Sequence, residues 1–501
     1  MTSQAPPECP IAVIGAGFAG IGMGIQLKRA GIHSFRIFER AGEIGGTWRD
    51  NTYPGAACDV PSQVYSYSFE LNPDWSRSFS ESAEIQAYLL RCVEKYGLRA
   101  HLELNTEIVD ARFDEEAGLW TLATSRDETV TARVVCSGVG GLVDPSWPDI
   151  KGIQSFRGEI FHTARWDHDC DLAGKNVAVI GTGASAIQVI PAIASQVGKL
   201  DVFQRSAAWV IPKRDRRIPE RVRQRFRRFP WLQRLVRWLL FGLSEAMGPI
   251  IVLNSKRLSA IGERASLRHL EASVSDPELR RKLTPDFQFG CKRVLISDDY
   301  WSTLERENVE LVTEPIAEIR ADGIETKDGR LHPADVIVVA TGFALGLASA
   351  PFPVTGRGGR SLSDVWSRGA VAYKGMTVSG FPNWFIMMGP NTGPGHTSVI
   401  VYTEAQIAYI LQAVRKLRSE NLRFVDVRQD VQDRYNAGLQ ARMKYTSWSS
   451  GCNSWYLDAD GGNHALFPGA ASEYCLRARR FRPSEYEIAR FQAASVSSPG
   501  A

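Results

Sequence analysis

Three glycines near the start of the chain, Gly15, Gly17 and Gly20, follow the spacing G-x-G-x-x-G. They come directly after an apolar run, residues 11–14, that is typical of a buried strand, and before residues 21–29, which are typical of a helix. In this arrangement the first glycine permits a tight turn, the second lets a pyrophosphate approach the backbone, and the third lets the helix pack against the strand. The spacing therefore predicts a site for the adenosine diphosphate half of FAD or NAD.

An acidic residue follows the next expected strand, residues 35–38, at Glu39. This is about 20 residues beyond the glycines, where the dinucleotide fingerprint places an acid. A carboxylate there accepts hydrogen bonds from ribose hydroxyls and repels a 2′-phosphate. The helix that starts after the glycines adds free N–H groups and a partial positive charge for the phosphates.

The same pattern returns later with one change. A strand at residues 176–180 precedes Gly181, Gly183 and Ala186 in G-x-G-x-x-A spacing, and a helix is expected at residues 185–194. The strand at residues 199–203 ends at Gln204 instead of an acid, and Arg205 and Ser206 follow. The Arg205 guanidinium is therefore free to bind a 2′-phosphate, and one charge-assisted bond of about 1.5–3 kcal/mol favours NADPH over NADH by about 10- to 100-fold. The two copies predict FAD at the first site and NADPH at the second.

The composition limits the classes of protein to which the chain can belong. The chain has 501 residues, of which 44% are hydrophobic and 23% are charged, as in folded globular proteins of two or more domains. The net charge of +4 does not favour nucleic-acid binding. The eight cysteines are scattered without C-x-x-C or zinc spacing, so reduced thiols, no metal site and a cytoplasmic location are expected. The first residues lack the pattern of a signal peptide, and no uncharged apolar stretch is long enough to span a bilayer.

The repeated pattern predicts an α/β protein with two Rossmann-like dinucleotide-binding domains, one for FAD and one for NADPH, and a helical insertion in the NADPH domain. Further elements are a helix at residues 80–96 with Ser80 as its N-cap, a meander at 107–132, a strand at 335–340 and a helix at 398–414. The expected boundaries are FAD domain 1–143, linker 144–175, NADPH domain 176–208, insertion 209–290, NADPH domain again 291–374, and FAD domain with a substrate-side C-terminal segment 375–501.

The insertion begins with a strongly basic run, KRDRRIPERVRQRFRRFP. An amphipathic segment follows, with Leu232, Leu235, Val236, Leu239, Leu240 and Leu243 on one helical face. Two interpretations stay open. The helix lies on an anionic membrane as a peripheral contact, or, as the sequence favours, it packs on the nucleotide domains with its arginines in solvent. Nothing in the sequence indicates an oligomeric state.

Two longer signatures support a family resemblance. The pattern F-x-G-x-x-x-H-x-x-x-W-[PD] is met by Phe156, Gly158, His162, Trp166 and Asp167, and [AG]-G-x-W-x-x-x-x-[FY]-P-[GM]-x-x-x-D is met by Gly45, Gly46, Trp48, Tyr53, Pro54, Gly55 and Asp59. With both nucleotide motifs, the chain resembles the type I Baeyer–Villiger monooxygenases, a branch of the class B flavoprotein monooxygenases within the superfamily of the flavin-containing monooxygenases. The resemblance covers nearly the whole chain and is weakest in the insertion and the C-terminal segment.

The resemblance implies a reaction and two catalytic residues. NADPH reduces FAD, the reduced flavin and O2 form a C4a-peroxide, and this peroxide converts a ketone or aldehyde into an ester or lactone; oxidation of sulfides is also expected. Arg293 matches the arginine that the family uses to hold the peroxide anion, and Lys292 matches the lysine near the 2′-phosphate. Asp59 resembles the acid that pairs with the arginine and positions it. A fixed cation in a dry site is what an anionic oxygen nucleophile needs.

The residues expected to bind the two cofactors come from the motifs, the signatures and the resemblance together. They are Gly15, Gly17, Phe18, Ala19, Gly20, Glu39, Arg40, Gly46, Thr47, Trp48, Tyr53, Asp59, Val60, Tyr65, Gly181, Gly183, Ala184, Ser185, Gln188, Arg205, Ser206, Lys292, Arg293, Thr341, Gly342, Asn391 and Trp448. For Trp448, a place in the protein core is the favoured interpretation.

The substrate does not follow from the resemblance. Val294 stands where the family's cyclic-ketone enzymes often have proline, and the loop that begins at Gly451 departs from their pattern. Trp448, Trp455 and Tyr456 suggest a small apolar carbonyl compound or sulfide. The alternatives are an oxygenase of amines or sulfides, an alkane hydroxylase, a pyridine nucleotide–disulfide reductase, and a non-catalytic scaffold. A reductase needs two redox cysteines near the flavin, usually about five residues apart, and Cys58 has no such neighbour.

Overall fold

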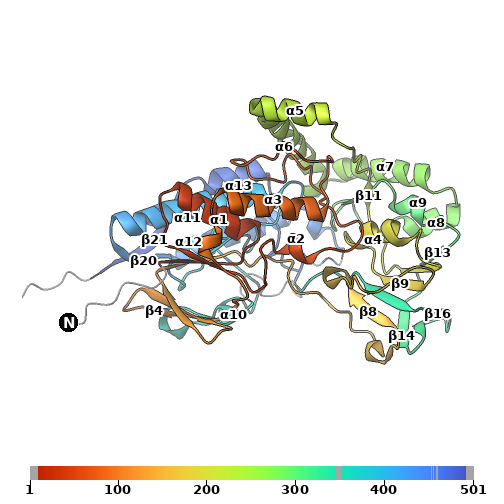
Figure 1. The fold of residues 1–501 in the computed structure, drawn as a ribbon, viewed down its shortest axis with the longest axis horizontal. Helices are drawn as coiled ribbons and strands as arrows, with labels where there is room; N and C mark the ends of the chain where they lie inside the picture. The colour runs from red at the N-terminus through yellow and green to blue at the C-terminus, as the bar shows by residue number, and fades with distance from the viewer. Residues whose placement is uncertain (1–9, 345–350, 453, 455, 459–460, 492–501) are drawn as a thin grey trace, which may run out of the picture.

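The protein has two halves, each built around a five-stranded parallel sheet (Figure 1). The computed structural model describes residues 10–344, 351–452, 454, 456–458 and 461–491. The first sheet has the order β19-β7-β1-β2-β3. Its strands are β1 (Ile11–Ile14), β2 (Arg36–Phe38), β3 (Leu102–Glu103), β7 (Val134–Ser137) and β19 (Trp384–Ile386). A late segment of the chain, β19, thus completes the first sheet by pairing with β7.

Helices α1 (Phe18–Arg29), α3 (Ser82–Lys95) and α11 (Val399–Ser419) pack together over the first sheet. All four residues of β1 are buried. A Cβ atom at Gly22 of α1 would lie 3.0 Å from Tyr67 and 3.0 Å from Ile407, so the small residue lets α11 approach closely. Apolar burial of about 25 cal/mol per Å² makes this cluster the main source of stability in this half.

The second sheet repeats the architecture with the order β13-β10-β9-β17-β8. Its strands are β8 (Glu159–His162), β9 (Asn176–Ile180), β10 (Lys199–Phe203), β13 (Val309–Val312) and β17 (Val336–Val339). Helices α4 (Ala186–Ile193) and α9 (Tyr300–Thr303) pack beside it. The prediction of an α/β protein with two Rossmann-like folds is confirmed.

Smaller sheets and helices complete both halves. The first half adds the meander β4 (Ile108–Asp114), β5 (Leu119–Thr124) and β6 (Thr129–Ala132) with β18 (Val354–Thr355), the pair β20 (Leu422–Val427) and β21 (Tyr486–Arg490), and helices α2 (Thr47–Asp50), α10 (Leu362–Val365), α12 (Gln429–Met443) and α13 (Ala471–Ala478). The second adds β14 (Ile316–Arg320), β15 (Gly323–Thr326) and β16 (Leu331–Pro333).

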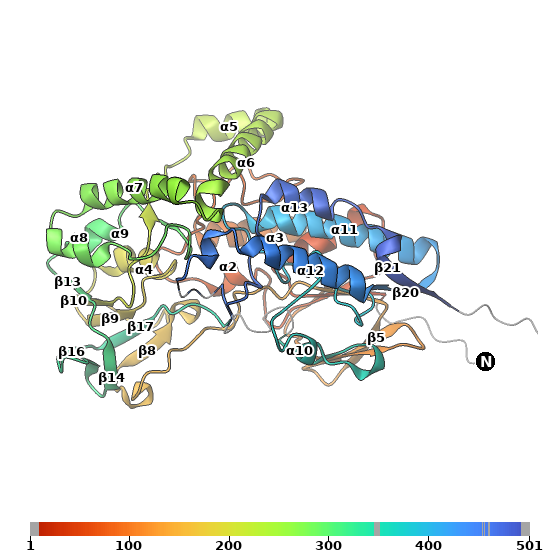
Figure 2. The same ribbon diagram turned by 180° about the vertical axis from the view of Figure 1, so that it is seen from behind.

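The insertion is helical, as predicted. It contains α5 (Glu220–Arg228), α6 (Pro230–Val252), α7 (Lys256–Ser273) and α8 (Pro277–Leu283). Its two ends are joined by the short parallel strands β11 (Val210–Ile211) and β12 (Leu295–Ile296). Figures 1 and 2 both show α5 and the adjoining end of α6 projecting from the top of the molecule, away from the two sheets.

The structure differs from the sequence expectations at several boundaries. Helix α1 begins at Phe18, three residues before the expected start, and the N-cap of α3 is Glu81, so the prediction of Ser80 is wrong. Strand β8 lies within the expected linker, and it pairs with β17. Strand β18 pairs with β4, so the chain returns to the first half before the expected boundary at residue 374. The places of β8 and β18 follow from strand pairings between distant segments, which local periodicity does not report.

Candidate active site

The first glycine loop is shaped by contacts that exclude side chains. Gly15 has φ of +92°, and a Cβ there would lie 2.7 Å from the Gly138 carbonyl oxygen; a Cβ at Gly20 would lie 1.8 Å from the Gly15 oxygen. At Gly17, by contrast, the nearest atom to a Cβ would be the Gly46 Cα at 3.9 Å. The helix that begins at Phe18 has no side-chain cap, so its first-turn N–H groups face this open space. The loop therefore fits a pyrophosphate.

Glu39 is fixed beside this loop. It follows β2 and is 5% exposed. Its carboxylate accepts bonds from the Ala16 N–H at 2.9 Å, the Ala41 N–H at 3.0 Å and the Arg49 guanidinium at 2.9 Å. These bonds hold an acid at the end of the strand, where the fingerprint expects one. Its neighbour Arg40 lies at the surface, near the carboxylates of Glu107 and Asp144.

The segment that carries the long signature lies where the two halves meet. The Trp48 indole N–H donates to the Tyr65 hydroxyl at 3.0 Å. The Tyr53 hydroxyl donates to Gln188 Oε1 at 2.8 Å, and the Gln188 amide donates to the Ala57 carbonyl at 2.9 Å. Gln188 thus joins α4 of the second half to the signature loop of the first. Of the other residues expected to bind FAD, Gly46 is the N-cap of α2, Thr47 begins that helix, Val60 directly follows Asp59, and Ala19 lies in the first turn of α1.

The second glycine loop has the same design. Gly181 has φ of +117°, and a Cβ there would lie 2.5 Å from the Ala340 oxygen, whereas a Cβ at Gly183 would meet no atom within 4 Å. Ala184 follows, and Ser185 is the N-cap of α4, although its side chain does not cap the helix. Thr341 and Gly342 continue from β17, and the Thr341 hydroxyl donates to the Ser146 carbonyl at 2.5 Å. This loop also leaves room for phosphate.

Two cations and a hydroxyl converge near the end of β10. The Lys292 ammonium donates to the Ser206 hydroxyl at 3.1 Å. Burial and the nearby charge of Arg205 both lower the pKa of Lys292. Like charges placed together are unfavourable without an anion, and an anion at this point would favour the charged form of both. The cluster therefore fits a 2′-phosphate, as the sequence predicts.

Arg293 and Asp59 form an ion pair between the two halves. Arg293 Nη2 lies 2.5 Å from Asp59 Oδ2. The negative charge of Asp59 raises the pKa of Arg293 well above its ordinary value, against the effect of burial. The Arg293 side chain keeps 46% of its surface exposed, so the held guanidinium still faces open space. The structure thus brings together the two residues that the resemblance assigns to catalysis.

Tyr456, in the C-terminal segment, interacts electrostatically with this ion pair. Its side chain is buried, and burial raises its pKa to about 12, with smaller and opposite effects from Arg293 and Asp59. The tyrosine is therefore neutral at neutral pH beside the charged pair. The sequence suggests Tyr456 only as one of several aromatics near the substrate and does not place it beside Arg293. Trp455 lies outside the described residues.

His162 and Trp166 lie at and just after the end of β8. His162 Nδ1 accepts a bond from the Ala164 N–H at 3.1 Å, and burial lowers the pKa of His162 to about 4. The imidazole is therefore neutral at neutral pH. Trp166 packs edge-on against Phe161 at 5.0 Å between ring centres. Both residues hold the signature segment against the second sheet.

Asn391 and Trp448 are held in protein interior. The Asn391 amide donates to the carbonyls of Asn463 and Leu466 at 2.8 and 3.0 Å. Trp448 is 1% exposed, in a cluster with Val252, Met443, Tyr456 and Leu466. The favoured interpretation of Trp448 as a core residue agrees with this position.

The expectation that all cysteines are reduced is wrong. Cys291 and Cys452 form a disulfide, although 161 residues separate them in the sequence. Among the described residues, Cys58, Cys92, Cys136, Cys170 and Cys475 are free. The disulfide ties the residue just before Lys292 and Arg293 to the C-terminal segment that carries Tyr456. Spacing along the chain does not reveal a pair brought together only by folding.

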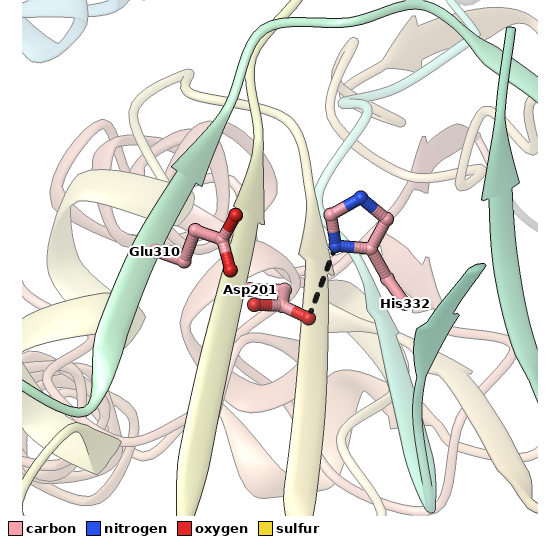
Figure 3. Close-up of side chains that lie close together, drawn as sticks. All are labelled: Asp201, Glu310 and His332. Atoms are coloured by element: carbon pink, nitrogen blue, oxygen red, sulfur yellow. Dashed lines mark ion pairs between the residues drawn. The ribbon is translucent and has the colours of Figure 1, made fainter. Parts of the chain in front are cut away.

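A separate group of ionisable side chains lies on the second five-stranded sheet and on strand β16 of the adjacent three-stranded sheet (Figure 3). Asp201 on β10 faces Glu310 on β13, and His332 Nδ1 lies 3.4 Å from Asp201. The Lys199 ammonium lies 3.0 Å from Asp201 and 3.1 Å from Glu310. Burial lowers the pKa of Lys199, but the bonds to these carboxylates raise it by more, so the lysine stays charged. The lysine supplies the positive charge that a metal ion would otherwise bring.

Comparison with known proteins identifies the family. A family model described as pyridine nucleotide-disulphide oxidoreductase matches residues 12–230. A Baeyer–Villiger monooxygenase of Pseudomonas aeruginosa is 45% identical over 99% of this chain and 94% of its own length. The chain belongs to the Baeyer–Villiger monooxygenases. The whole-chain match decides between this family and the disulphide reductases that share the 12–230 region.

Solved monooxygenases have the same fold. The OTEMO complex with FAD and NADP is 27% identical, has a TM-score of 0.86, and aligns over 97% of this chain and 100% of that one. The cyclohexanone monooxygenase from Rhodococcus sp. Phi1 bound to NADP+ is 28% identical with a TM-score of 0.86, over 97% and 100% of the two chains. The predicted family, monooxygenase activity and pair of cofactors, FAD and NADP(H), are confirmed.

Replacing Arg205 tests the coenzyme site. Arg205→Ala is expected to raise the KM for NADPH by about 10- to 100-fold, because one charge-assisted bond to the 2′-phosphate is lost, and to leave the KM for NADH nearly unchanged. Steady-state kinetics with both coenzymes measure this, with the exposed Arg217→Ala as control. Equal changes for both coenzymes would place Arg205 away from the 2′-phosphate.

Replacing Cys452 tests the disulfide. Cys452→Ser is expected to lower the free energy of unfolding by about 2–4 kcal/mol, because the cross-link restricts the unfolded chain. Thermal unfolding of the FAD-loaded protein measures the loss, with Cys170→Ser as control for the removal of a thiol that is free in the structure. Mass spectrometry after alkylation should find Cys291 and Cys452 linked in the wild type. Two alkylated thiols at these positions would contradict the pairing.

Proposed function

We propose that this monooxygenase uses O2 and NADPH to oxidise a small apolar ketone or aldehyde to an ester or lactone, and that it also oxidises sulfides. The observation that carries the proposal is the Asp59–Arg293 ion pair, which crosses between the two halves and presents a charged guanidinium. In the name of the solved cyclohexanone monooxygenase the substrate is a ketone. Bound FAD, reduced by NADPH, supplies the oxygen-transfer chemistry.

The ion pair has two tasks in this reaction. Asp59 holds the guanidinium of Arg293 in one position and stabilises its positive charge. Arg293 in turn offers its exposed donors to the negative charge that oxygen transfer develops. A preorganised cation costs no reorganisation at that moment, and removing one such donor typically lowers the rate by about 100- to 1000-fold.

The surrounding residues position and enclose this cation. Tyr456 and the Cys291–Cys452 disulfide bring the C-terminal segment against the Arg293 loop. The Gln188 bonds to Tyr53 and Ala57 fix the opposite side, where the second half meets the signature loop. These contacts hold the Arg293 loop from two sides, so the cation stays in position while oxygen is transferred.

An apolar substrate is supported by the aromatic character of the segment that reaches the ion pair. Trp448 and Tyr456 are both buried there, with Leu466 in the same cluster. We also propose a cytoplasmic location for the enzyme, since it consumes NADPH. The disulfide is unusual for that compartment, and alkylation of thiols in intact cells before lysis, followed by the same mass spectrometry, shows whether it forms there.

Replacing Arg293 separates ketone oxidation from flavin reduction. Arg293→Ala is expected to reduce FAD with NADPH but to lower ester formation by at least about 100-fold and to release hydrogen peroxide, because the negative charge loses its fixed cation. Arg293→Lys should retain part of the activity. Rapid-mixing absorbance follows FAD reduction, and gas chromatography follows the ester from a panel of linear, cyclic and aryl ketones.

The exposed Arg306→Ala, in the same half, is the control and should behave as the wild type. A normal ester yield from Arg293→Ala would remove Arg293 from the mechanism. A variant that oxidises sulfides normally but no ketone would show that the cation serves ketone oxidation alone.

A further inference from the structure

Helix α6 is amphipathic, but unlike the usual surface helix it turns its polar side toward the protein and its apolar side toward solvent. The exposed apolar side chains are Trp231 (62%), Leu235 (47%), Trp238 (67%), Leu239 (65%), Leu243 (57%) and Met247 (42%). They recur every three or four residues and so lie on one face. A contiguous apolar face of this kind on a protein surface indicates an interaction site.

The polar side of α6 is fixed by hydrogen bonds to the body of the protein. The Gln233 amide donates to Gln63 and to the Asn72 carbonyl, both at 2.7 Å. Arg237 donates to the carbonyls of residues 63, 64 and 66, and Glu245 accepts from residues 396, 471 and 472. Turning the helix to bury its apolar face would break all of these bonds. The apolar side therefore faces outward because the inward contacts require it.

The basic residues of the insertion flank this apolar face. Residues 213–237 contain eleven basic and two acidic residues. Arg223 and Arg227 pair with Glu220. The side chains of Arg221, Arg225, Arg228 and Arg234 are exposed along α5 and the start of α6. Positive charge thus lies next to exposed tryptophan and leucine, at the end of the molecule that projects in Figures 1 and 2.

We propose that α5 and the outward face of α6 bind the surface of an anionic lipid bilayer. The apolar side chains enter the boundary between headgroups and acyl chains, and the arginines contact the anionic headgroups. A second copy of the chain fits less well, because two strongly basic arms would repel each other. The proposal goes beyond the oxygenation reaction and does not depend on it.

The contact is peripheral rather than spanning. Within the described residues, α6 is the one helix that is long and apolar enough to cross a membrane by length and composition. The sequence did not indicate such a helix, because the criterion applied there requires a stretch without charged residues. Its inward face, however, is bonded to the protein through Gln233, Arg237 and Glu245. A spanning helix would have to give up these bonds. The helix therefore lies on the bilayer surface.

Helix α6 also links the docking face to the active site. The Ser447 hydroxyl lies 2.6 Å from the Ile251 carbonyl at the end of α6 and 3.1 Å from the Gly290 carbonyl, just before Cys291 and Arg293. The C-terminal end of α6 thus lies beside the loop that carries Arg293.

Vesicle co-sedimentation of the FAD-loaded protein tests the proposal. The protein is expected to pellet with vesicles of phosphatidylcholine and phosphatidylglycerol, and only weakly with phosphatidylcholine alone. Salt should weaken the binding, because it screens the arginines. The double variants Trp238→Gln/Leu239→Gln and Arg221→Glu/Arg225→Glu should each reduce binding by about tenfold or more.

The chain offers matched controls away from the arm. Leu476→Gln changes an exposed leucine on α13 (68% exposed), and Arg415→Glu/Arg418→Glu reverses two exposed charges on α11. Both should bind vesicles as the wild type does. All variants should keep NADPH consumption with a water-soluble ketone, which shows that they are folded.

Three results would overturn the proposal: no binding to anionic vesicles, equal losses in the arm variants and the controls, or equal binding to neutral and anionic vesicles. A dimer in sedimentation velocity that Trp238→Gln/Leu239→Gln dissociates would also overturn it and would assign the face to a second copy. Because the readout is binding, failure here leaves ketone oxidation untouched.

Discussion

The ion pair between Asp59 and Arg293 is the constraint on which the active site depends. Asp59 belongs to the signature loop of the first half and Arg293 to the second half, so the pair exists only when the two halves meet correctly. Gln188 fixes the same interface through Tyr53 and Ala57. Since the carboxylate holds the guanidinium in place, the cation is positioned before any negative charge develops.

The nucleotide sites could be predicted from the sequence because their geometry is local. Gly15 and Gly181 are required by positive φ values and by carbonyl oxygens that leave no room for a Cβ atom. Gly17 and Gly183 border open space, as a phosphate requires. Glu39 follows the strand at the first site, whereas Gln204 and then Arg205 follow the equivalent strand at the second, and the sequence predicts the two different cofactors from this change.

Other features depend on contacts between distant segments, which the sequence does not display. The Cys291–Cys452 disulfide, the electrostatic interaction of Tyr456 with Arg293, and the pairings of β8 with β17 and of β18 with β4 are of this kind. The periodicity of α6 indicated an amphipathic helix but not which side faces the protein. The bonds of Gln233, Arg237 and Glu245 decide that question, and they leave the apolar side exposed.

The most direct test of the central claim is a double-mutant cycle on the ester formed per NADPH consumed, with Asp59→Asn, Arg293→Lys and the double variant. Because Asp59 acts by positioning Arg293, the account predicts strong coupling of about 1.5–3 kcal/mol, so that the double variant is no worse than the poorer single variant. Losses that simply add would contradict the account, because they would show that the carboxylate and the guanidinium act independently.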